Sequence, residues 1–452
     1  MDLLSKKGYN LPLQNNPSHK LGVLDTPKKI KLHPNNFPGI KPKLLVSKGD
    51  NIKKGQPIYF DKKNPEVMYT SFLPGIIDNI VYGQKRVIES IDIAVDSTIG
   101  SILYNKYKIN EIKNLNKEKI KEILCTSGTW QFIRKKPYSK IPDPGKMPNS
   151  IFITTSSTEP YAPSLKVLLE NINVEYLQAG ISALSHFVDD SINMVCPQKF
   201  TSNKLQSLFG IDFHTFSGPH PSGNVGYHIS NIAPIKDKDH IVWYISLYDI
   251  SIIGELLLAG CLNDSKIIAV GGMSEGERNK HYLISRGMLI NDIVSLDNNR
   301  HQNRVISGSV LSGAIISQDE SLGFYDDIIS VLDNRHDRQF IGWLSPGISK
   351  FSLSRTFLSK LFKTKTNPFS TAMNGGVRSI VPIGLVEKMC NLDIMPTMLI
   401  KSIIARDIEM MEELGIYECS PEDFGLCSFI DASKMDIMGI IQEGLDYVEL
   451  EG

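Results

Sequence analysis

The sequence has no excess of charge of either sign, because its 452 residues contain 49 Lys and Arg and 49 Asp and Glu. A general nucleic-acid binder shows a basic excess, so this balance argues against nucleic acid as a partner. A credible membrane-spanning run is also missing, since the most apolar window, 241–260, contains Asp249 and Glu255. Each of these carboxylates costs roughly 2.5 kcal/mol or more near the centre of a bilayer. Charges at Asp2 and Lys6 lead us to expect no signal peptide, so any work at a membrane would need a partner.

Cysteine is scarce and scattered. The six cysteines are Cys125, Cys196, Cys261, Cys390, Cys419 and Cys427, and none of them forms a C-x-x-C pair. Their spread indicates reduced thiols in a cytosol rather than a disulfide framework. The chain is also long enough for two to four domains, each with its own core.

A glycine-rich phosphate loop of the usual kind is absent as well. The stretch SGPHPSGNVGYHI carries Gly218, Gly223 and Gly226 in the spacing G-x4-G-x2-G, whereas a dinucleotide fingerprint needs G-x-G-x-x-G before a helix. The residues after Gly226 predict a strand. We interpret the glycines as positions of positive φ or of close backbone approach. The loop is then either a structural constraint or the lining of a site or partner surface.

Strands and helices alternate around this loop. Residues 241–246 predict a strand, and a helix follows from an N-cap at Asp249 to a stop at Gly260. Residues 266–270 predict a further buried strand, so the three elements resemble a βαβ unit with a parallel sheet. The same alternation from 103 to 272 predicts one Rossmann-like α/β domain.

The remaining segments complete a multidomain α/β and α+β chain. Short strands and glycine turns in 40–102, with the pattern V-x-x-G-D-x4-G-Q, resemble a biotinyl/lipoyl-like β domain. We expect an N-terminal extension at 1–39, a β-grasp-like module at 273–330, a mixed connecting region at 331–380 and a C-terminal helical domain at 381–452. Within the last, apolar spacing predicts helices over 385–390, 396–414 and 436–447.

Two lysines raise an alternative function. Biotinyl/lipoyl carriers present a lysine on a hairpin, and Lys62 and Lys63 lie at about that place in DKKNPEV. A carrier needs one lysine at a tight exposed turn, whereas this segment is longer and has Pro65 close behind. Solvated turn lysines are the simpler interpretation. A carrier or redox protein with a lysine-linked group there, or with a bound flavin, stays open as the alternative.

Several long segments identify a family resemblance. FPGIKPKLLVSKGDNIKKGQPIYFDKKNPEV, SGTWQFIRKKPYSKIP, GPHPSGNVGYHI and MCNLDIMPTMLIKSIIARDIEMMEELGIYECSPEDFGLCSFIDASK closely resemble the A subunit of the sodium-translocating NADH:quinone reductases, nearly end to end. The resemblance implies a peripheral protein on the cytoplasmic face of the bacterial inner membrane. It implies integral-membrane and flavin-carrying partner subunits, in a complex that couples NADH oxidation and quinone reduction to sodium export. It also implies ubiquinone or menaquinone as a contact of this chain, and flavins and iron–sulfur centres on the partners.

A more distant resemblance suggests what the chain has lost. The C subunit of the Rnf electron-transport complex is similar in domain order, and the flavin-carrying subunit of complex I is similar in part of it. These relatives have a flavin-binding glycine-rich loop and cysteine clusters. Here Gly128 is followed by a tryptophan and a basic, proline-rich run. Cys390, Cys419 and Cys427 alone stand at cluster-like places, whereas one cluster needs about four thiolates. The resemblance thus implies a degenerate ferredoxin-like C-terminal domain and a chain without a cofactor, metal site or catalytic residue of its own.

A quinone contact is the remaining site hypothesis. A quinone head needs donors for its carbonyls and flat walls for its ring. His220 and His228 could serve as donors and Trp130 and Phe132 as walls, if the two loops meet at the carboxyl ends of parallel strands. The alternative is that the histidines bond backbone groups and the aromatics fill the core.

Overall fold

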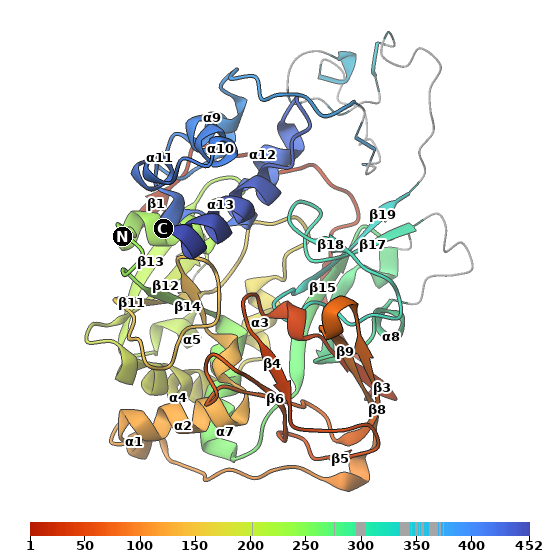
Figure 1. Ribbon diagram of the computed structural model, residues 1–452, viewed down its shortest axis with the longest axis vertical. Helices are drawn as coiled ribbons and strands as arrows, with labels where there is room; N and C mark the ends of the chain where they lie inside the picture. Colours follow the sequence, from red (N-terminus) through yellow and green to blue (C-terminus); the bar gives the residue numbers. More distant parts are fainter. Residues whose placement is uncertain are drawn as a thin grey trace.

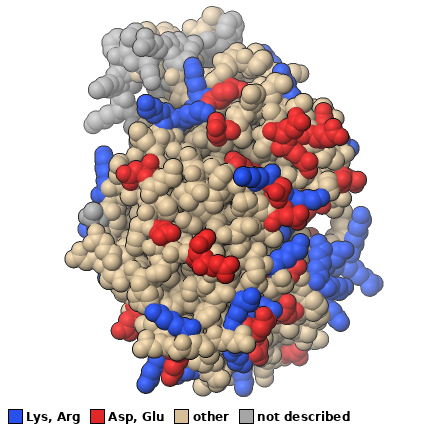
Figure 2. Space-filling model, turned by 90° about the vertical axis from the view of Figure 1, so that its left-hand side faces the viewer, with Lys and Arg blue, Asp and Glu red and all other residues tan. Residues whose placement is uncertain are grey.

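A computed structural model describes residues 1–200, 202–274, 276–294, 303–334 and 375–452, with a few residues between 344 and 373. These described residues form four sheets and a C-terminal group of helices (Figure 1). The region predicted as a mixed connection, 331–380, lies largely outside the described residues. On the face in Figure 2, basic and acidic side chains lie next to one another in several places, and neither sign covers the surface.

Two small sheets form the N-terminal β domain, a four-stranded sheet of order β3-β9-β8-β5 and a three-stranded sheet of order β4-β6-β7. Their strands are β3 (Lys29–Leu32), β4 (Pro42–Leu44), β5 (Asn51–Ile52), β6 (Pro57–Asp61), β7 (Met68–Thr70), β8 (Gly75–Tyr82) and β9 (Ile88–Val95), and the 3-10 turn η1 (Pro34–Asn36) follows β3. β-Branched residues such as Ile30, Ile58 and Ile91 are fully buried here. Such residues suit a pleated, half-buried surface, which explains why these short segments form strands.

The α/β domain has one sheet of order β1-β13-β12-β11-β14-β10. Its strands are β1 (Asp2–Leu4), β10 (Arg134–Lys136), β11 (Ser150–Thr154), β12 (Ile192–Pro197), β13 (Ile211–Ser217) and β14 (Val242–Ser246). All neighbours are parallel except β10, which runs antiparallel to β14. The helices are α1 (Ile109–Ile112), α2 (Lys117–Ser127), α3 (Leu165–Glu170), α4 (Val174–Leu184), α5 (Asn203–Gln206), α6 (Val225–Ile232) and α7 (Leu247–Ala259).

A second six-stranded sheet has the order β18-β17-β19-β15-β16-β2. Its members are β2 (Ser18–Val23), β15 (Ser265–Gly271), β16 (Lys280–Ser285), β17 (Asn303–Ser307), β18 (Ala314–Ile315) and β19 (Ile328–Asp333), with helix α8 (Ile290–Ile293) beside them. The predicted βαβ unit is therefore wrong. β14 and α7 belong to the α/β domain, but β15 leaves it to pair antiparallel with β16 and parallel with β19.

The C-terminal part is helical, as predicted. It contains α9 (Leu385–Met389), α10 (Pro396–Ala405), α11 (Ile408–Glu413), α12 (Gly425–Ile430) and α13 (Ile437–Glu451). The single helix predicted over 396–414 is two helices, because Arg406 adopts a left-handed conformation with φ of 56°. Asp407 then caps α11 by accepting a hydrogen bond from the Met410 backbone N–H.

Two local predictions in the central stretch were wrong. The segment after Gly226 is not a strand but helix α6, whose apolar side packs under the C-terminal helices. Asp249 is not the N-cap of α7. Ser246 is, since its hydroxyl accepts from the Asp249 backbone N–H and donates to the Asp249 carboxylate. Gly260 ends the helix as predicted, in a left-handed conformation with φ of 69°.

Candidate functional site

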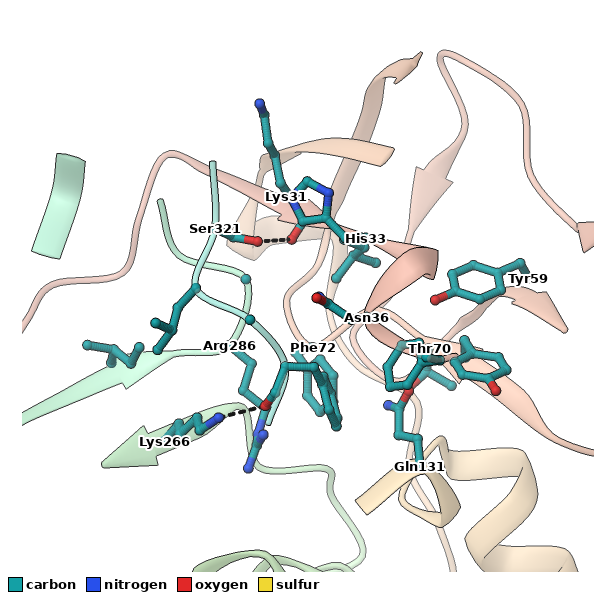
Figure 3. A pocket seen from close by; sticks show the side chains of 18 residues that line it. Lys31, His33, Asn36, Tyr59, Thr70, Phe72, Gln131, Lys266, Arg286 and Ser321 are labelled. Carbon is teal, nitrogen blue, oxygen red and sulfur yellow. Dashed lines mark hydrogen bonds between the residues drawn. The ribbon is translucent and has the colours of Figure 1, made fainter. Parts of the chain in front are cut away.

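A pocket opens between the N-terminal β domain, the second sheet and the segment before β10 (Figure 3). Its empty volume is about 540 Å³, part of which is open to solvent. Its lining comprises Lys31, Leu32, His33, Asn36, Phe37, Tyr59, Tyr69, Thr70, Phe72, Gln131, Lys266, Ile284, Arg286, Gly287, Ser321, Leu322, Gly323 and Phe324. We call it the interdomain pocket.

Aromatic rings form one wall of the interdomain pocket. The Phe37 ring centroid lies 4.8 Å from that of Tyr69 and 4.9 Å from that of Phe324. Tyr59 and Tyr69 are stacked with centroids 4.6 Å apart. These rings come from the end of η1, from β6 and β7, and from the segment before β19, so three distant parts of the chain meet in one aromatic surface. Such a surface suits the face of a planar ring.

Two side-chain amides enter the same space. Asn36 reaches in from η1 and Gln131 from the segment before β10 (Figure 3). Neither amide makes a side-chain hydrogen bond within the described part of the chain, although the Gln131 backbone oxygen accepts from the Tyr325 hydroxyl at 2.8 Å. Because an amide offers both donors and an acceptor, the two side chains can bond the oxygens of a ligand.

Two cations occupy the inner end of the interdomain pocket. Lys266, 8% exposed on β15, donates from Nζ to the Phe324 backbone oxygen at 2.6 Å. Arg286, 4% exposed after β16, pairs through Nη2 with Asp249 of α7. Its guanidinium lies 4.6 Å from the Phe132 ring centroid, within cation–π range. Burial lowers the pKa of Lys266 to about 8.

Basic residues at the rim of the pocket lie beside a carboxylate. Lys31 Nζ lies 3.0 Å from Glu320 Oε1, and His33 Nε2 lies 3.0 Å from Glu320 Oε2, although not at a hydrogen-bond angle. Ser321 donates from its hydroxyl to the Lys31 backbone oxygen at 3.0 Å (Figure 3). Glu320 therefore neutralises the basic rim, whereas the inner end keeps its cations.

The structure places His220 and His228 elsewhere, in a junction between the α/β domain and the C-terminal helices. Both are 1% exposed. His228 Nε2 lies 2.9 Å from the Ser222 backbone oxygen, and His220 Nδ1 lies 3.3 Å from the Thr158 hydroxyl. Burial lowers the pKa of both histidines to about 4. They are neutral residues that hold the loop together.

The glycines of the loop serve the same junction. Gly218 has a φ of +135°, the torsion that favours glycine. Gly223 and Gly226 are close-approach positions instead. A Cβ on Gly223 would lie 2.6 Å from the Thr158 backbone nitrogen, and one on Gly226 would collide with the Asp423 carboxylate.

A buried ion pair closes this junction. Lys136 Nζ donates to the Glu418 backbone oxygen at 2.9 Å and lies 3.4 Å from Asp423 Oδ2, with both side chains at most 1% exposed. Asn224 donates to the other Asp423 oxygen at 3.1 Å. The loops at the carboxyl ends of the parallel strands are thus packed against the C-terminal part.

Trp130 and Phe132 do not meet the histidines. Both rings belong to the core on the sheet face of Ile151 and Ile153, whereas His228 packs against Phe216, which belongs to the core on the opposite face. Trp130 donates from its indole to the Pro142 backbone oxygen at 2.9 Å. Phe132 stacks on Phe324, a pocket-lining ring, at 5.7 Å, so it supports the interdomain pocket from behind.

The other candidate groups lie apart. Lys62 and Lys63 are exposed in the loop between β6 and β7, and Lys63 Nζ donates to the Gly39 backbone oxygen at 2.7 Å. Burial raises the pKa of the thiols Cys390, Cys419 and Cys427. Among the described residues, no group of three or more His, Cys, Asp and Glu side chains is arranged to hold a metal ion. No helix in the described ranges is long and apolar enough to cross a membrane.

Asn36, Gln131 and Lys266 were not among the residues predicted for the site. Gln131 stands between the two aromatics that were. Lys266 could have been singled out from the sequence, because it is a lysine in the largely apolar strand SKIIAVG.

Comparisons with known proteins define the class first. A family model described as the NqrA N-terminal barrel-sandwich hybrid domain matches residues 3–96, and one described as the NqrA second alpha/beta domain matches 115–262. The chain is therefore a multidomain α/β protein with an N-terminal barrel-sandwich domain, which confirms the coarse fold prediction.

Full-length relatives then give the family. The A subunit of the Na(+)-translocating NADH-quinone reductase of Tolumonas auensis is 34% identical over 448 residues, and that of Pasteurella multocida is 34% identical over 451 residues. The A subunit from Neisseria meningitidis serogroup B is 36% identical over 452 residues. Each match covers 99% of both chains. The chain belongs to this A-subunit family, as the resemblance predicted, and is part of a multisubunit, sodium-translocating NADH-quinone reductase.

Proposed function

We propose that this chain binds the quinone head group in the interdomain pocket. The observation that carries the proposal is the pair of amides, Asn36 and Gln131, which lack side-chain partners among the described residues and face aromatic walls. A quinone offers two carbonyl oxygens on a flat ring, so its oxygens match the amide N–H groups and its faces match the rings. Ubiquinone and menaquinone share this chemistry.

The chain's place in the complex is part of the proposal. We expect a peripheral protein on the cytoplasmic face of the bacterial inner membrane, docked on integral-membrane and flavin-carrying subunits. Its support is membership of a family named for a multisubunit, sodium-translocating reductase. Nucleic acid is not expected as a partner, because the net charge is zero.

The finer fold assignments are proposals too. The strand order β13-β12-β11-β14 supports a Rossmann-like α/β domain, because doubly wound sheets share it. A β-grasp-like module and a degenerate ferredoxin-like C-terminal domain remain predictions, as do the boundaries at 39, 102, 272, 330 and 380.

We further propose that flavins and iron–sulfur centres reside on the partners. The number of thiols supports this, because Cys390, Cys419 and Cys427 are three cysteines and one cluster needs about four thiolates. The alternative is a carrier with a group on Lys62 or Lys63. The intact mass, absorbance spectrum and iron content of the purified chain distinguish the two. An added mass on the lysines, a flavin band or stoichiometric iron would contradict a cofactor-free chain.

The quinone proposal is tested by calorimetric titration of the full-length chain with 2,3-dimethoxy-5-methyl-1,4-benzoquinone. Because each hydrogen bond contributes about 1 kcal/mol, Asn36→Leu and Gln131→Leu should each weaken binding about three- to tenfold. Asn114→Leu, an exposed amide after α1, is the matched control and should bind like the wild type. Absence of saturable binding, or equal affinity in all variants, would remove the quinone from this pocket.

A further inference from the structure

The two ends of the interdomain pocket differ in how their charges are compensated. Its lining includes the four basic residues Lys31, His33, Lys266 and Arg286, but no described Asp or Glu. At the rim, the carboxylate of Glu320 lies within 3.0 Å of both Lys31 Nζ and His33 Nε2. The inner end has no lining carboxylate among the described residues, so its cations face the space directly.

Of the two cations at the inner end, Lys266 is the one without a carboxylate partner among the described residues. Arg286 pairs with Asp249, whereas Lys266 forms no ion pair with a described carboxylate and bonds the neutral Phe324 backbone oxygen. That bond uses one of the three N–H donors of the ammonium. Lys266 and Arg286 lie side by side at the end of the pocket, beyond Phe72 (Figure 3). A buried ammonium with free donors has lost hydration that only a ligand or water can replace.

We infer that the Lys266 end is an anion subsite, which binds a ring oxygen of the quinone when that oxygen carries negative charge. The inference rests on the proposed quinone function and adds a specificity to it. Lys266 is then a specificity-determining residue. The pocket should prefer an ionised hydroxyquinone over a neutral quinone of the same size.

Two naphthoquinones test this preference on the full-length chain at pH 7. The first is 2-hydroxy-1,4-naphthoquinone, whose hydroxyl is ionised at neutral pH, and the second is neutral 2-methyl-1,4-naphthoquinone. The affinity for the hydroxyquinone divided by that for the methylquinone should fall about tenfold in Lys266→Met. This ratio should be retained in Lys266→Arg. Lys62→Met removes an exposed lysine outside the pocket lining, so it should leave the ratio within about twofold of the wild type.

A pH titration of the wild-type chain gives a second test that needs no variant. Arg286, Asp249, Asp326 and Asp327 are the charged groups that act on Lys266, and burial places its pKa at about 8. The preference for the anionic quinone should therefore decline as the pH rises through about 8. This readout replaces Lys266→Met if that variant fails to fold.

The outcomes separate the two levels of the proposal. If both quinones bind but their ratio is the same in the wild type and Lys266→Met, or does not change through pH 8, the anion subsite is wrong and the quinone pocket stands. If neither quinone binds the wild-type chain, the proposed function fails and the subsite with it.

Discussion

Buried polar side chains divide into two kinds in this protein. His220 and His228 each have one ring nitrogen bonded and the other without a partner in the described part of the chain. They are enclosed by the loop and its neighbours. Asn36 and Gln131 instead line the interdomain pocket. Residue type alone does not separate the two kinds, because burial and available partners decide whether a donor serves the fold or a ligand.

The buried histidines should make stability fall in acid. Their pKa in the folded state is about 4, below the 6.5 of an exposed histidine. The unfolded chain therefore binds more protons between these values, and the free energy of unfolding decreases as the pH falls below about 6.5. From pH 7 to 4.5, each histidine should account for about 2–3 kcal/mol.

Urea unfolding of His228→Gln, with the exposed His19→Gln as control, measures this contribution. His228→Gln should lose less stability than the wild type on acidification, by about 2–3 kcal/mol at pH 4.5. His19→Gln should follow the wild type. An identical pH dependence in all three proteins would show that His228 is charged or solvated in the fold.

The sequence pattern correctly predicted those helices and strands whose formation depends on neighbouring residues in the chain. The strand at 241–246, the Gly260 stop and the C-terminal helices follow from side-chain spacing and capping. Helix α6 did not follow, because VGYHISNI is rich in residues with strand preference and packing beneath the C-terminal helices overrides it. The predicted parallel partner of β15 was wrong for a related reason. That partner is β19 rather than β14, and the pairing of strands far apart in the sequence is not set by local pattern.

The glycine loop permits a test of its role as a junction. Gly226→Ala would place a Cβ against the Asp423 carboxylate and 2.8 Å from Lys136 Nζ, so the buried ion pair must shift. We expect a loss of about 2–4 kcal/mol in the free energy of unfolding, the range for overpacking and for disturbing a buried pair.

Gly376→Ala is the matched control, because a Cβ there meets no atom within 4 Å. It should change stability by less than about 1 kcal/mol, and so should the exposed Lys62→Ala. Equal losses in Gly226→Ala and Gly376→Ala would show that the junction is loosely packed.

The whole molecule explains why the site was only partly predictable. The interdomain pocket combines residues near 31–37, 59–72, 131, 266–286 and 321–324, which become neighbours only when three sheets assemble. One predicted segment does reach this pocket, because Phe132 supports its wall and Gln131 precedes Phe132. The sequence did not show which residues would face that segment. The predicted partner His228 does not, because the sheet of the α/β domain separates it from Trp130.

Quinone reduction by the assembled complex shows whether the interdomain pocket or the loop at 218–228 binds the quinone. Initial rates should be measured at several quinone concentrations for Gln131→Leu, Asn36→Leu, His220→Ala and His228→Ala, with assembly checked for each. We expect KM for quinone to rise about three- to tenfold in Gln131→Leu and Asn36→Leu at normal assembly. Both histidine variants should keep the wild-type KM in the complex that assembles. A raised KM in the histidine variants, with unchanged KM in Gln131→Leu and Asn36→Leu, would exclude quinone binding in the interdomain pocket and move the quinone to the loop at 218–228.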